Sequence, residues 1–470
     1  MHWRPTAAFA AVLATALLFP ATCLAAAGSL DRSFDGNGRL VIKATRYTSG
    51  GNPFEVTRLQ PITMASAAAP DGELVVADTW RVLRFRASGR PQRHFAGDGR
   101  AVIPTPAGMG FQLAGVAVDS RGRVLVAGTT KPIGATGGSR DARARVYRFL
   151  PDGNLDPSFG SHGFAGEQLG PMEATGLVVD ARDRPVLTGF TALTPSTCDS
   201  TPVYLNTTVV ARLTASGAPD PTFGGGGTFV DPLEDPHLPA LTASGKGLVY
   251  ISAPEQRCAW FAENYRAGGA PLASVLSPDG GLVRRFPVRP GEPHGYALEG
   301  LLEVTSLAVD RQDRIVVLMT ATPPEGGDEI LQEVRRLLPD GNSDPEWQPW
   351  ISDITGWGSE QPVEAITTDR HNRVVLAGSL LGPEGEVTSR LPTRGFAVRR
   401  LNAAGKLQTW FGRDGVARAW FGKGTAATAR QVFLDSRGRI VLGGTVETLQ
   451  RHGPPTEYSL AFARFLSGRR

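Results

Sequence analysis

Apolar and polar residues follow a hairpin-like pattern that recurs along the chain. In its clearest copy, an apolar stretch leads into a turn that begins at Asp119, and a second apolar stretch ends at Gly128. Clear copies lie at residues 116–128, 177–189, 307–319, 366–378 and 432–444, and weaker ones at 67–78 and 241–252. Such a repeat is typical of proteins in which each repeat buries its apolar face against the next.

The turn inside each clear copy has the residue types of a tight β-hairpin. Three residues after the turn Asp stands Gly122, Asp183, Asp313, Asn372 or Gly438. These residue types tolerate a left-handed backbone, which a type I turn followed by a bulge requires. We therefore predict a pair of antiparallel strands in each copy.

A second element follows the hairpin and contains a glycine with an aromatic residue six positions later. The pairs are Gly89/Phe95, Gly153/Phe159, Gly217/Phe223, Gly280/Phe286, Gly341/Trp347 and Gly405/Phe411. With the hairpin, this element gives two strands, a variable loop and two further strands in each repeat. Four antiparallel strands repeated in this way are typical of the blades of a β-propeller.

The two ends of the chain complement each other. Residues 463–468 correspond to a third strand without a fourth, whereas residues 28–42 correspond to an isolated fourth strand. The sequence therefore predicts an all-β protein: a seven-bladed β-propeller with four antiparallel strands per blade, whose last blade is closed by residues 28–42. Closure of this kind leaves no long open sheet edge.

The repeats resemble the delta-60 repeat family. The resemblance rests on Arg-Phe-Leu-Pro-Asp-Gly at residues 148–153 and Leu-Asp-Pro-Ser-Phe-Gly at residues 155–160, and it covers essentially all of residues 28–470. The resemblance implies a propeller in an exported bacterial protein. It implies no particular activity, because the family has no established common function. The fourth and fifth repeats depart most from the pattern.

The first 27 residues have the features of a secretory signal peptide. His2 and Arg4 give a basic start, and an apolar run at residues 7–19 is too short for a stable membrane anchor. Alanines at residues 25–27 suit cleavage before Gly28, whereas Cys23 leaves a lipid anchor as an alternative. We expect residues 28–470 to form one exported domain, periplasmic or extracellular, with no transmembrane segment.

Charge does not point to a nucleic-acid partner. The chain has 49 basic and 45 acidic residues and a net charge of +4, spread without blocks of one sign. A nucleic-acid-binding surface would concentrate basic residues. We expect a monomer whose partner is a protein, a peptide or a glycan.

Two cysteines follow the predicted cleavage site, Cys198 and Cys258. Both fall in predicted loops of adjacent repeats, nearly one repeat length apart. An even number of cysteines in an exported chain favours a disulfide, which would join the two loops. Two free thiols are the alternative.

Polar residues recur at a position predicted to surround the mouth of the central channel. This position lies seven residues before the turn Asp, or its equivalent, and holds Gln112, Glu173, His237 and Glu303 in four repeats. Carboxylate and imidazole groups suit a divalent cation, so these residues are a candidate metal or ligand site. The alternative is that they are polar only because a channel mouth is wet.

Two other patterns of acidic residues admit a structural explanation. The residues Asp152, Asp156, Asp220, Asp340 and Asp344 resemble calcium loops but lack their ordered oxygen ligands and closing Glu. We interpret them as caps of turns. The Asp/Arg pairs that flank each hairpin turn, such as Asp119/Arg123, are predicted to be surface ion pairs of little energetic weight.

These observations favour a binding function over catalysis. The sequence has no serine in a Gly-x-Ser-x-Gly setting, and its histidines are scattered. Variable loops on a rigid frame are typical binding surfaces. We therefore expect an exported, non-enzymatic binding or scaffold propeller. The alternatives are a metal-dependent, lactonase-like hydrolase acting at the channel mouth, by analogy of fold, and a structural subunit of an envelope assembly.

Overall fold

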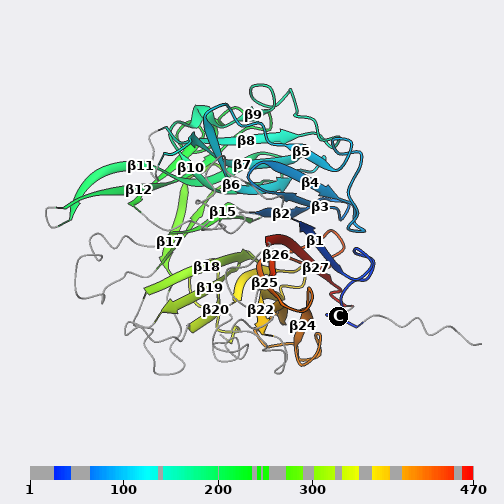
Figure 1. Cartoon of the computed structure of the whole chain (residues 1–470). Helices are drawn as coiled ribbons and strands as arrows, with labels where there is room; N and C mark the ends of the chain where they lie inside the picture. Colours follow the sequence, from blue (N-terminus) through cyan, green and yellow to red (C-terminus); the bar gives the residue numbers. More distant parts are fainter. Residues whose placement is uncertain are drawn as a thin grey trace, which may run out of the picture.

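The chain folds into antiparallel β-sheets that follow one another along the sequence (Figure 1). The computed structural model describes residues 26–43, 64–135, 141–198, 201–234, 241–244, 247–252, 271–288, 301–322, 331–348, 363–381, 394–448 and 458–468. Within these ranges the one helix is a single 3-10 turn, η1 (Glu167–Leu169). No helix of the described part is long and apolar enough to cross a membrane.

Four sheets contain four consecutive strands each. The first two comprise β2 (Ala65–Ala68), β3 (Leu74–Ala77), β4 (Arg81–Phe85) and β5 (Arg100–Val102), and β6 (Met109–Val118), β7 (Val124–Pro132), β8 (Arg143–Phe149) and β9 (Phe164–Ala165). The next two comprise β10 (Glu173–Val179), β11 (Pro185–Cys198), β12 (Thr201–Arg212) and β13 (Thr228–Glu234), and β14 (Leu241–Ser244), β15 (Gly247–Ser252), β16 (Leu272–Leu276) and β17 (Leu282–Pro287).

The remaining strands form a three-stranded and an eight-stranded sheet. The smaller sheet comprises β18 (Leu301–Val309), β19 (Ile315–Thr322) and β20 (Leu331–Leu337). The larger one has two halves, β21 (Val363–Thr368), β22 (Val374–Leu381), β23 (Arg394–Leu401) and β24 (Val416–Ala419), and β25 (Thr425–Leu434), β26 (Ile440–Thr448), β27 (Tyr458–Phe465) and β1 (Arg39–Lys43). One parallel bridge, Arg394 to Ala426, joins the halves. We call each set of successive strands a unit and name it by its first strand.

The N-terminal strand takes the fourth position in the β25 unit. β1 pairs antiparallel with β27, from Arg39 opposite Ala463 to Lys43 opposite Ser459. The backbone N–H of Gly28 also donates to the carbonyl of Leu466 at 2.8 Å. The two ends of the described chain are therefore joined in one sheet.

The first strand of each unit lies on the inner side of the molecule. First strands of successive units contact each other, from β2 to β6, β10, β14, β18, β21 and β25, and β25 also contacts β2. The positions that line the centre of the molecule therefore belong to the first strands.

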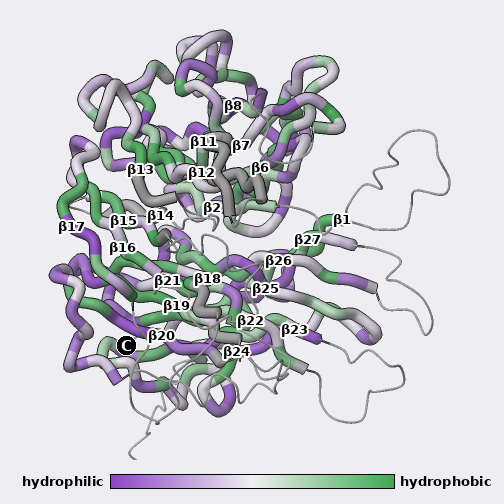
Figure 2. The backbone as a smooth tube through the Cα atoms, turned by 90° about the vertical axis from the view of Figure 1, so that its left-hand side faces the viewer, coloured by the Kyte–Doolittle hydropathy of each residue, from purple (hydrophilic) through white to green (hydrophobic). Residues whose placement is uncertain are grey.

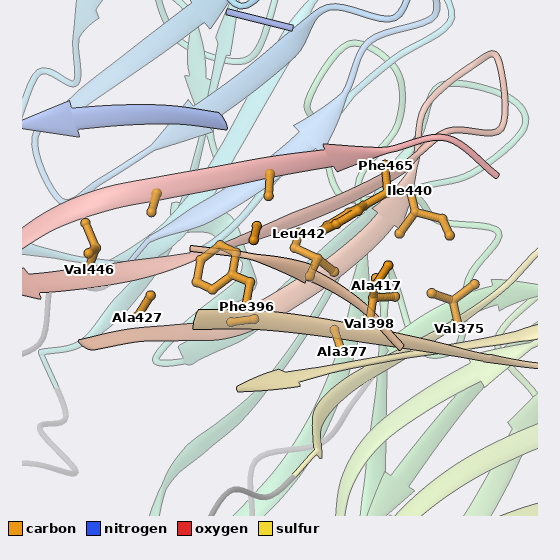
Figure 3. Close-up of a cluster of buried hydrophobic side chains, with 14 of the residues drawn as sticks. Val375, Ala377, Phe396, Val398, Ala417, Ala427, Ile440, Leu442, Val446 and Phe465 are labelled. Atoms are coloured by element: carbon orange, nitrogen blue, oxygen red, sulfur yellow. The ribbon is translucent and has the colours of Figure 1, made fainter. Parts of the chain in front are cut away.

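Apolar side chains fill the layers between facing sheets. Figure 3 shows one layer, in which Phe396 and Val398 of β23 lie near Ala427 of β25 and Leu442 of β26. Second strands such as β7 are buried on both faces, because a sheet packs on either side. This explains their unbroken apolar runs. In Figure 2 the hydrophobic colour lies mainly in strands, and the hydrophilic colour gathers in the connecting turns.

In every unit except the β14 unit, a buried arginine on the third strand links the unit to the next. Arg148 donates from Nε to Asp156 Oδ2 (2.9 Å), and its guanidinium lies 4.3 Å from the ring centre of Phe159. Its Nη1 donates to the carbonyl of Ala215 in the next unit. We call this arrangement the arginine latch. It recurs at Arg212, Arg336 and Arg464, and with altered partners at Arg84 and Arg400.

The latch explains the spacing of glycine and aromatic residues in the sequence. The glycine of one unit packs on the aromatic ring of the preceding unit, as Gly280 does on Phe223, the ring that Arg212 covers. Gly280 has a φ of +83°, and a Cβ at this position would lie 2.8 Å from the ring. A larger residue would therefore be both strained and obstructed.

The acidic partner of the latch is held ionised by several groups. Burial alone would raise the pKa of Asp220, but hydrogen bonds from Thr222 and the guanidinium of Arg212 lower it to about 2. Asp156 is bonded similarly, because its Oδ1 accepts the N–H (3.0 Å) and O–H (2.6 Å) of Ser158. The turn-capping interpretation of Asp152, Asp156, Asp220, Asp340 and Asp344 is confirmed. Three of them, Asp156, Asp220 and Asp344, also bind an arginine.

The Asp/Arg pairs of the hairpin turns are not surface ion pairs, so that prediction was wrong. The Asp119 side chain is only 1% exposed, and Arg123 binds it at 2.6 Å while reaching towards Asp156 at 3.6 Å. Oδ1 of Asp119 also caps the backbone N–H groups of Arg121 and Arg123. These pairs therefore add buried ionic contacts to the latch. Removing one partner would leave the other charge buried without a partner, which is strongly destabilising.

The β14 unit departs from this pattern. Val275 stands where the other units have the latch arginine. Arg284 on the neighbouring strand instead donates to the carbonyl of Pro339 in the next unit at 2.7 Å. Asp231 of β13, which belongs to the preceding β10 unit, is buried and accepts hydrogen bonds from Tyr250 and Arg285 of the β14 unit, both at 2.6 Å. Different residues thus link this unit to its neighbours.

The latch of the β21 unit lacks an acid, which makes it a site for stabilisation. Gln408 occupies the acid's position and binds Arg400 Nε at 2.5 Å. Burial and the charge of Arg373 lower the pKa of Arg400 to about 10. We predict that Gln408→Asp stabilises the protein by about 1.5–3 kcal/mol, the usual contribution of a hydrogen bond to a charged group. Urea unfolding would measure it.

Gln408→Asn is the matched control for this substitution. It has the length of Asp without the charge, so it should not stabilise the protein. Equal stability of the two variants would show that charge at this position is irrelevant to the latch.

Candidate functional site

Five inner strands carry a β-bulge at the same position. The bulge leaves one residue without a partner on the second strand, and this residue stands five positions before the turn Asp. The five residues are Ala114, Thr175, Thr305, Glu364 and Arg430. Bulges redirect side chains and are frequent next to functional sites. At these five positions, which form one column across the inner strands, the regular alternation of side chains between the two faces of the sheet is therefore interrupted.

Glycines on the second strand allow the inner strand to approach closely beside the bulge. A Cβ at Gly189 would lie 2.1 Å from the carbonyl oxygen of Glu173, and one at Gly444 would lie 1.9 Å from that of Thr428. These are the small residues that end the apolar stretches of the repeat. Their lack of a side chain leaves room for the backbone of the residue that stands seven positions before the turn Asp.

The predicted channel-mouth residues have different environments. Gln112 is exposed and stands opposite Thr129, whereas Glu173 is 8% exposed and begins β10. Glu303 stands opposite Thr320 in β18, and His237 lies outside the described residues. In the ranges that the structure describes, no three His, Cys, Asp or Glu side chains gather as a metal site. The metal-binding role of these residues stays a prediction.

The predicted disulfide also stays a prediction. Cys198 is the last residue of β11 and stands opposite Thr201. Cys258 lies outside the described residues.

The bulges of two adjacent units carry opposite charges. Glu364 of the β21 unit is half-buried, and Arg430 of the β25 unit is exposed; their strands contact each other. Burial raises the pKa of Glu364, and the positive charge of Arg430 partly opposes this. Within the described ranges, neither side chain makes a hydrogen bond or an ion pair.

A second carboxyl group lies within electrostatic range of Arg430. Glu447 of β26 stands directly between Ala426 of β25 and Tyr458 of β27. Burial raises the pKa of Glu447, and Arg394 and Arg430 partly oppose this. Burial and the charge of Glu447 in turn raise the pKa of Tyr458.

Five residues therefore form one set at the junction of the β21 and β25 units. We call Arg394, Arg430, Glu364, Glu447 and Tyr458 the junction cluster. Among the described residues, the side chains of these five make no hydrogen bond or ion pair, although their charges influence one another. Clefts that hold titratable groups with shifted pKa values are candidates for functional sites.

Sequence reasoning missed the junction cluster because it examined a neighbouring column. The residue seven positions before the turn Asp is Pro362 in one of these units and Thr428 in the other. Two positions further on, the repeat has Ala or Thr in three units but Glu364 and Arg430 in these two. This difference between the units was the feature of the sequence from which the cluster could have been found.

One stretch of the chain matches a known family. Residues 122–159 match the model described as "Domain of unknown function (DUF5122) beta-propeller". The match includes β7, β8 and the latch residues Arg148, Asp156 and Phe159. The chain has a propeller fold. Its four-stranded antiparallel sheets are blades of the propeller. No curated protein matches the sequence.

Several solved structures are distantly similar. A protein of unknown function from Dyadobacter fermentans DSM 18053 is 12% identical, with a TM-score of 0.41, covering 77% of this chain and 97% of its own. A member of the DUF4221 family from Bacteroides vulgatus is 12% identical, with a TM-score of 0.36 and coverages of 91% and 96%. An α-L-arabinofuranosidase from Fusarium graminearum is 9% identical, with a TM-score of 0.40 and coverages of 90% and 97%. At these values the likeness carries no argument about function.

The raised pKa of Glu364 predicts a pH-dependent stability. Its folded value lies above its ordinary value of 4.5. The stability that depends on the protonated group is therefore complete below the unfolded pKa and is lost as pH rises through the folded pKa. Glu364→Gln cannot ionise, so its stability relative to the wild type should increase as pH rises from the ordinary value of 4.5 through the raised folded pKa, and then level off.

Urea unfolding across this range would measure the effect. Glu346→Gln is the control, because Glu346 is an exposed glutamate outside the junction cluster. A difference between Glu364→Gln and the wild type that is constant with pH would contradict the burial of this carboxyl group.

Proposed function

We propose that this protein is an exported, seven-bladed propeller of the delta-60 repeat type that acts as a binding scaffold. The successive contacts of the first strands, including β25 with β2, support a closed ring. The pairing of β1 with β27 supports closure by the N-terminal strand. The composition of residues 1–27 supports export, to the periplasm or beyond.

The observation that carries the binding function is a hairpin arm. β11 pairs with β10 only as far as Phe190, and β12 pairs with β13 only from Thr207 onwards. Beyond these points, the two strands pair only with each other as far as Cys198 opposite Thr201. Figure 1 shows this arm projecting from the body of the molecule.

The arm is suited to contacting a partner rather than to supporting the fold. It lies at the predicted variable loops, opposite the turns that form the latches. Pro195 and Pro202 lie in its strands, and proline lacks the N–H that would pair with a further strand. The two prolines therefore disfavour unspecific pairing of the arm with strands of other molecules. A rigid frame with one projecting element is typical of a binding module.

Shortening the arm tests the binding function. A variant in which an Asn-Gly turn replaces residues 194–205 keeps all pairing to β10 and β13. We expect it to fold and melt as the wild type does, yet to lose binding partners from the cell envelope. Affinity capture with both proteins, compared by mass spectrometry, measures this. An identical set of partners would show that the arm is not the binding element.

Metal analysis separates a scaffold from the hydrolase alternative. We expect no stoichiometric divalent cation in purified protein. A cation that is present in the wild type and absent from the Glu173→Ala/Glu303→Ala variant would instead place a metal centre at the channel mouth and favour a hydrolase.

The proposed closure predicts a large effect of one residue near the N-terminus. Asp31 binds two arginines of the β25 unit, Arg464 at 2.9 Å and Arg439 at 3.0 Å. Asp31→Ala leaves both charges buried without their partner, so we expect a loss of about 3–5 kcal/mol in unfolding free energy. Deletion of residues 28–43 should broaden the thermal transition further.

The exposed pair of Arg100 and Asp98 provides the control. Its side chains are 65% and 63% exposed, so Asp98→Ala should cost less than about 1 kcal/mol. If Asp31→Ala costs no more than Asp98→Ala, the N-terminal strand does not contribute to closure as proposed.

A further inference from the structure

We propose that the junction cluster binds a neutral carbohydrate at the boundary between the β21 and β25 units, an inference that rests on the proposed ring of blades. The cluster combines donors, acceptors and an aromatic ring on inner and neighbouring strands. Nothing in the repeat explains its charges, because the bulge column holds Ala or Thr in the other three bulged units.

Strand register brings the members of the cluster together. Ala426, Glu447 and Tyr458 are directly opposite each other across β25, β26 and β27. Directly opposite residues of antiparallel strands project on the same face. The bridge from Arg394 to Ala426 extends this row into the neighbouring unit. Arg394 and Glu447 thus flank an alanine, whose small side chain leaves space between them.

The bulges place a second pair of charges nearer the axis. Glu364 and Arg430 occupy equivalent positions on adjacent inner strands. The equivalent positions elsewhere hold the small residues Ala114, Thr175 and Thr305. The charges at the bulge position are therefore confined to the two units that form the junction.

The charges of the cluster favour a ligand without net charge. Two arginines and two glutamates sum to zero formal charge, so the cluster exerts little net attraction on a simple anion or cation. Its groups are nevertheless unpaired within the described residues. Hydroxyl groups both donate and accept, so vicinal hydroxyls can bridge an arginine and a carboxyl group at once. The ring of Tyr458 adds an apolar face beside a polar edge.

Titration with sugars tests this proposal. D-glucose, D-galactose, L-rhamnose and maltose would be screened by saturation-transfer NMR, and binders measured by calorimetry. We expect at least one to bind the full-length mature protein. Arg430→Met and Glu364→Gln should each weaken its binding at least tenfold. Thr305→Val, at the equivalent bulge of the β18 unit, and Arg437→Gln, on an exposed turn, should bind as the wild type does.

The controls distinguish failure of this site from failure of the scaffold. All variants would be melted in parallel, and the arm-shortened protein would be titrated too, because the proposed site does not involve the arm. A wild type that melts cooperatively but binds none of the sugars overturns the site and leaves the scaffold standing. Sugar binding that Arg430→Met and Glu364→Gln leave unchanged, or binding of glycine in place of every sugar, also overturns it.

Discussion

The architecture depends on a charge that is buried between blades. A latch arginine such as Arg148 satisfies three requirements at once: it binds the acid of its own turn, covers an aromatic ring and donates to a carbonyl of the next unit. Burying a guanidinium is costly unless all its surroundings are in place. Each latch therefore fixes the position of the next unit, and the repeated turn sequences exist to provide its partners.

The sequence revealed the elements that are determined locally. Hairpin turns were predictable because their residue types set the backbone, and Asp183, Asp313 and Asn372 do have positive φ angles. The Gly–aromatic spacing predicted the turn between the third and fourth strands of each unit. What it could not show was why the spacing exists, since Arg148 and its carbonyl partner at Ala215 are 67 residues apart. The same limit explains the wrong prediction for Asp119 and Arg123, because Asp119 is buried and Arg123 reaches Asp156, a residue far along the chain in the same unit.

The candidate site was less predictable, because one extra residue changes which side chain faces inward. A bulge between Ala429 and Gln431 interrupts the alternation along β25. The position chosen from the sequence, seven residues before the turn Asp, holds Glu173 and Glu303. The bulged position, five residues before the turn Asp, holds Glu364 and Arg430 and was not chosen. Strand periodicity alone cannot locate such an insertion. The column of five bulge residues becomes meaningful only when their common register is known.

The junction cluster and the weakest latch occur at the same boundary. Arg400 is the latch arginine between the β21 and β25 units, and it has Gln408 where four other latches have an acid at the turn. The opposite side of this boundary carries the Arg394–Ala426 bridge, the one strand ladder between units in the described chain. A backbone bridge can hold two blades together without a complete charge pair. This boundary can therefore carry Glu364, Arg430 and Glu447 without side-chain partners among the described residues, whereas at other boundaries buried charges join adjacent units.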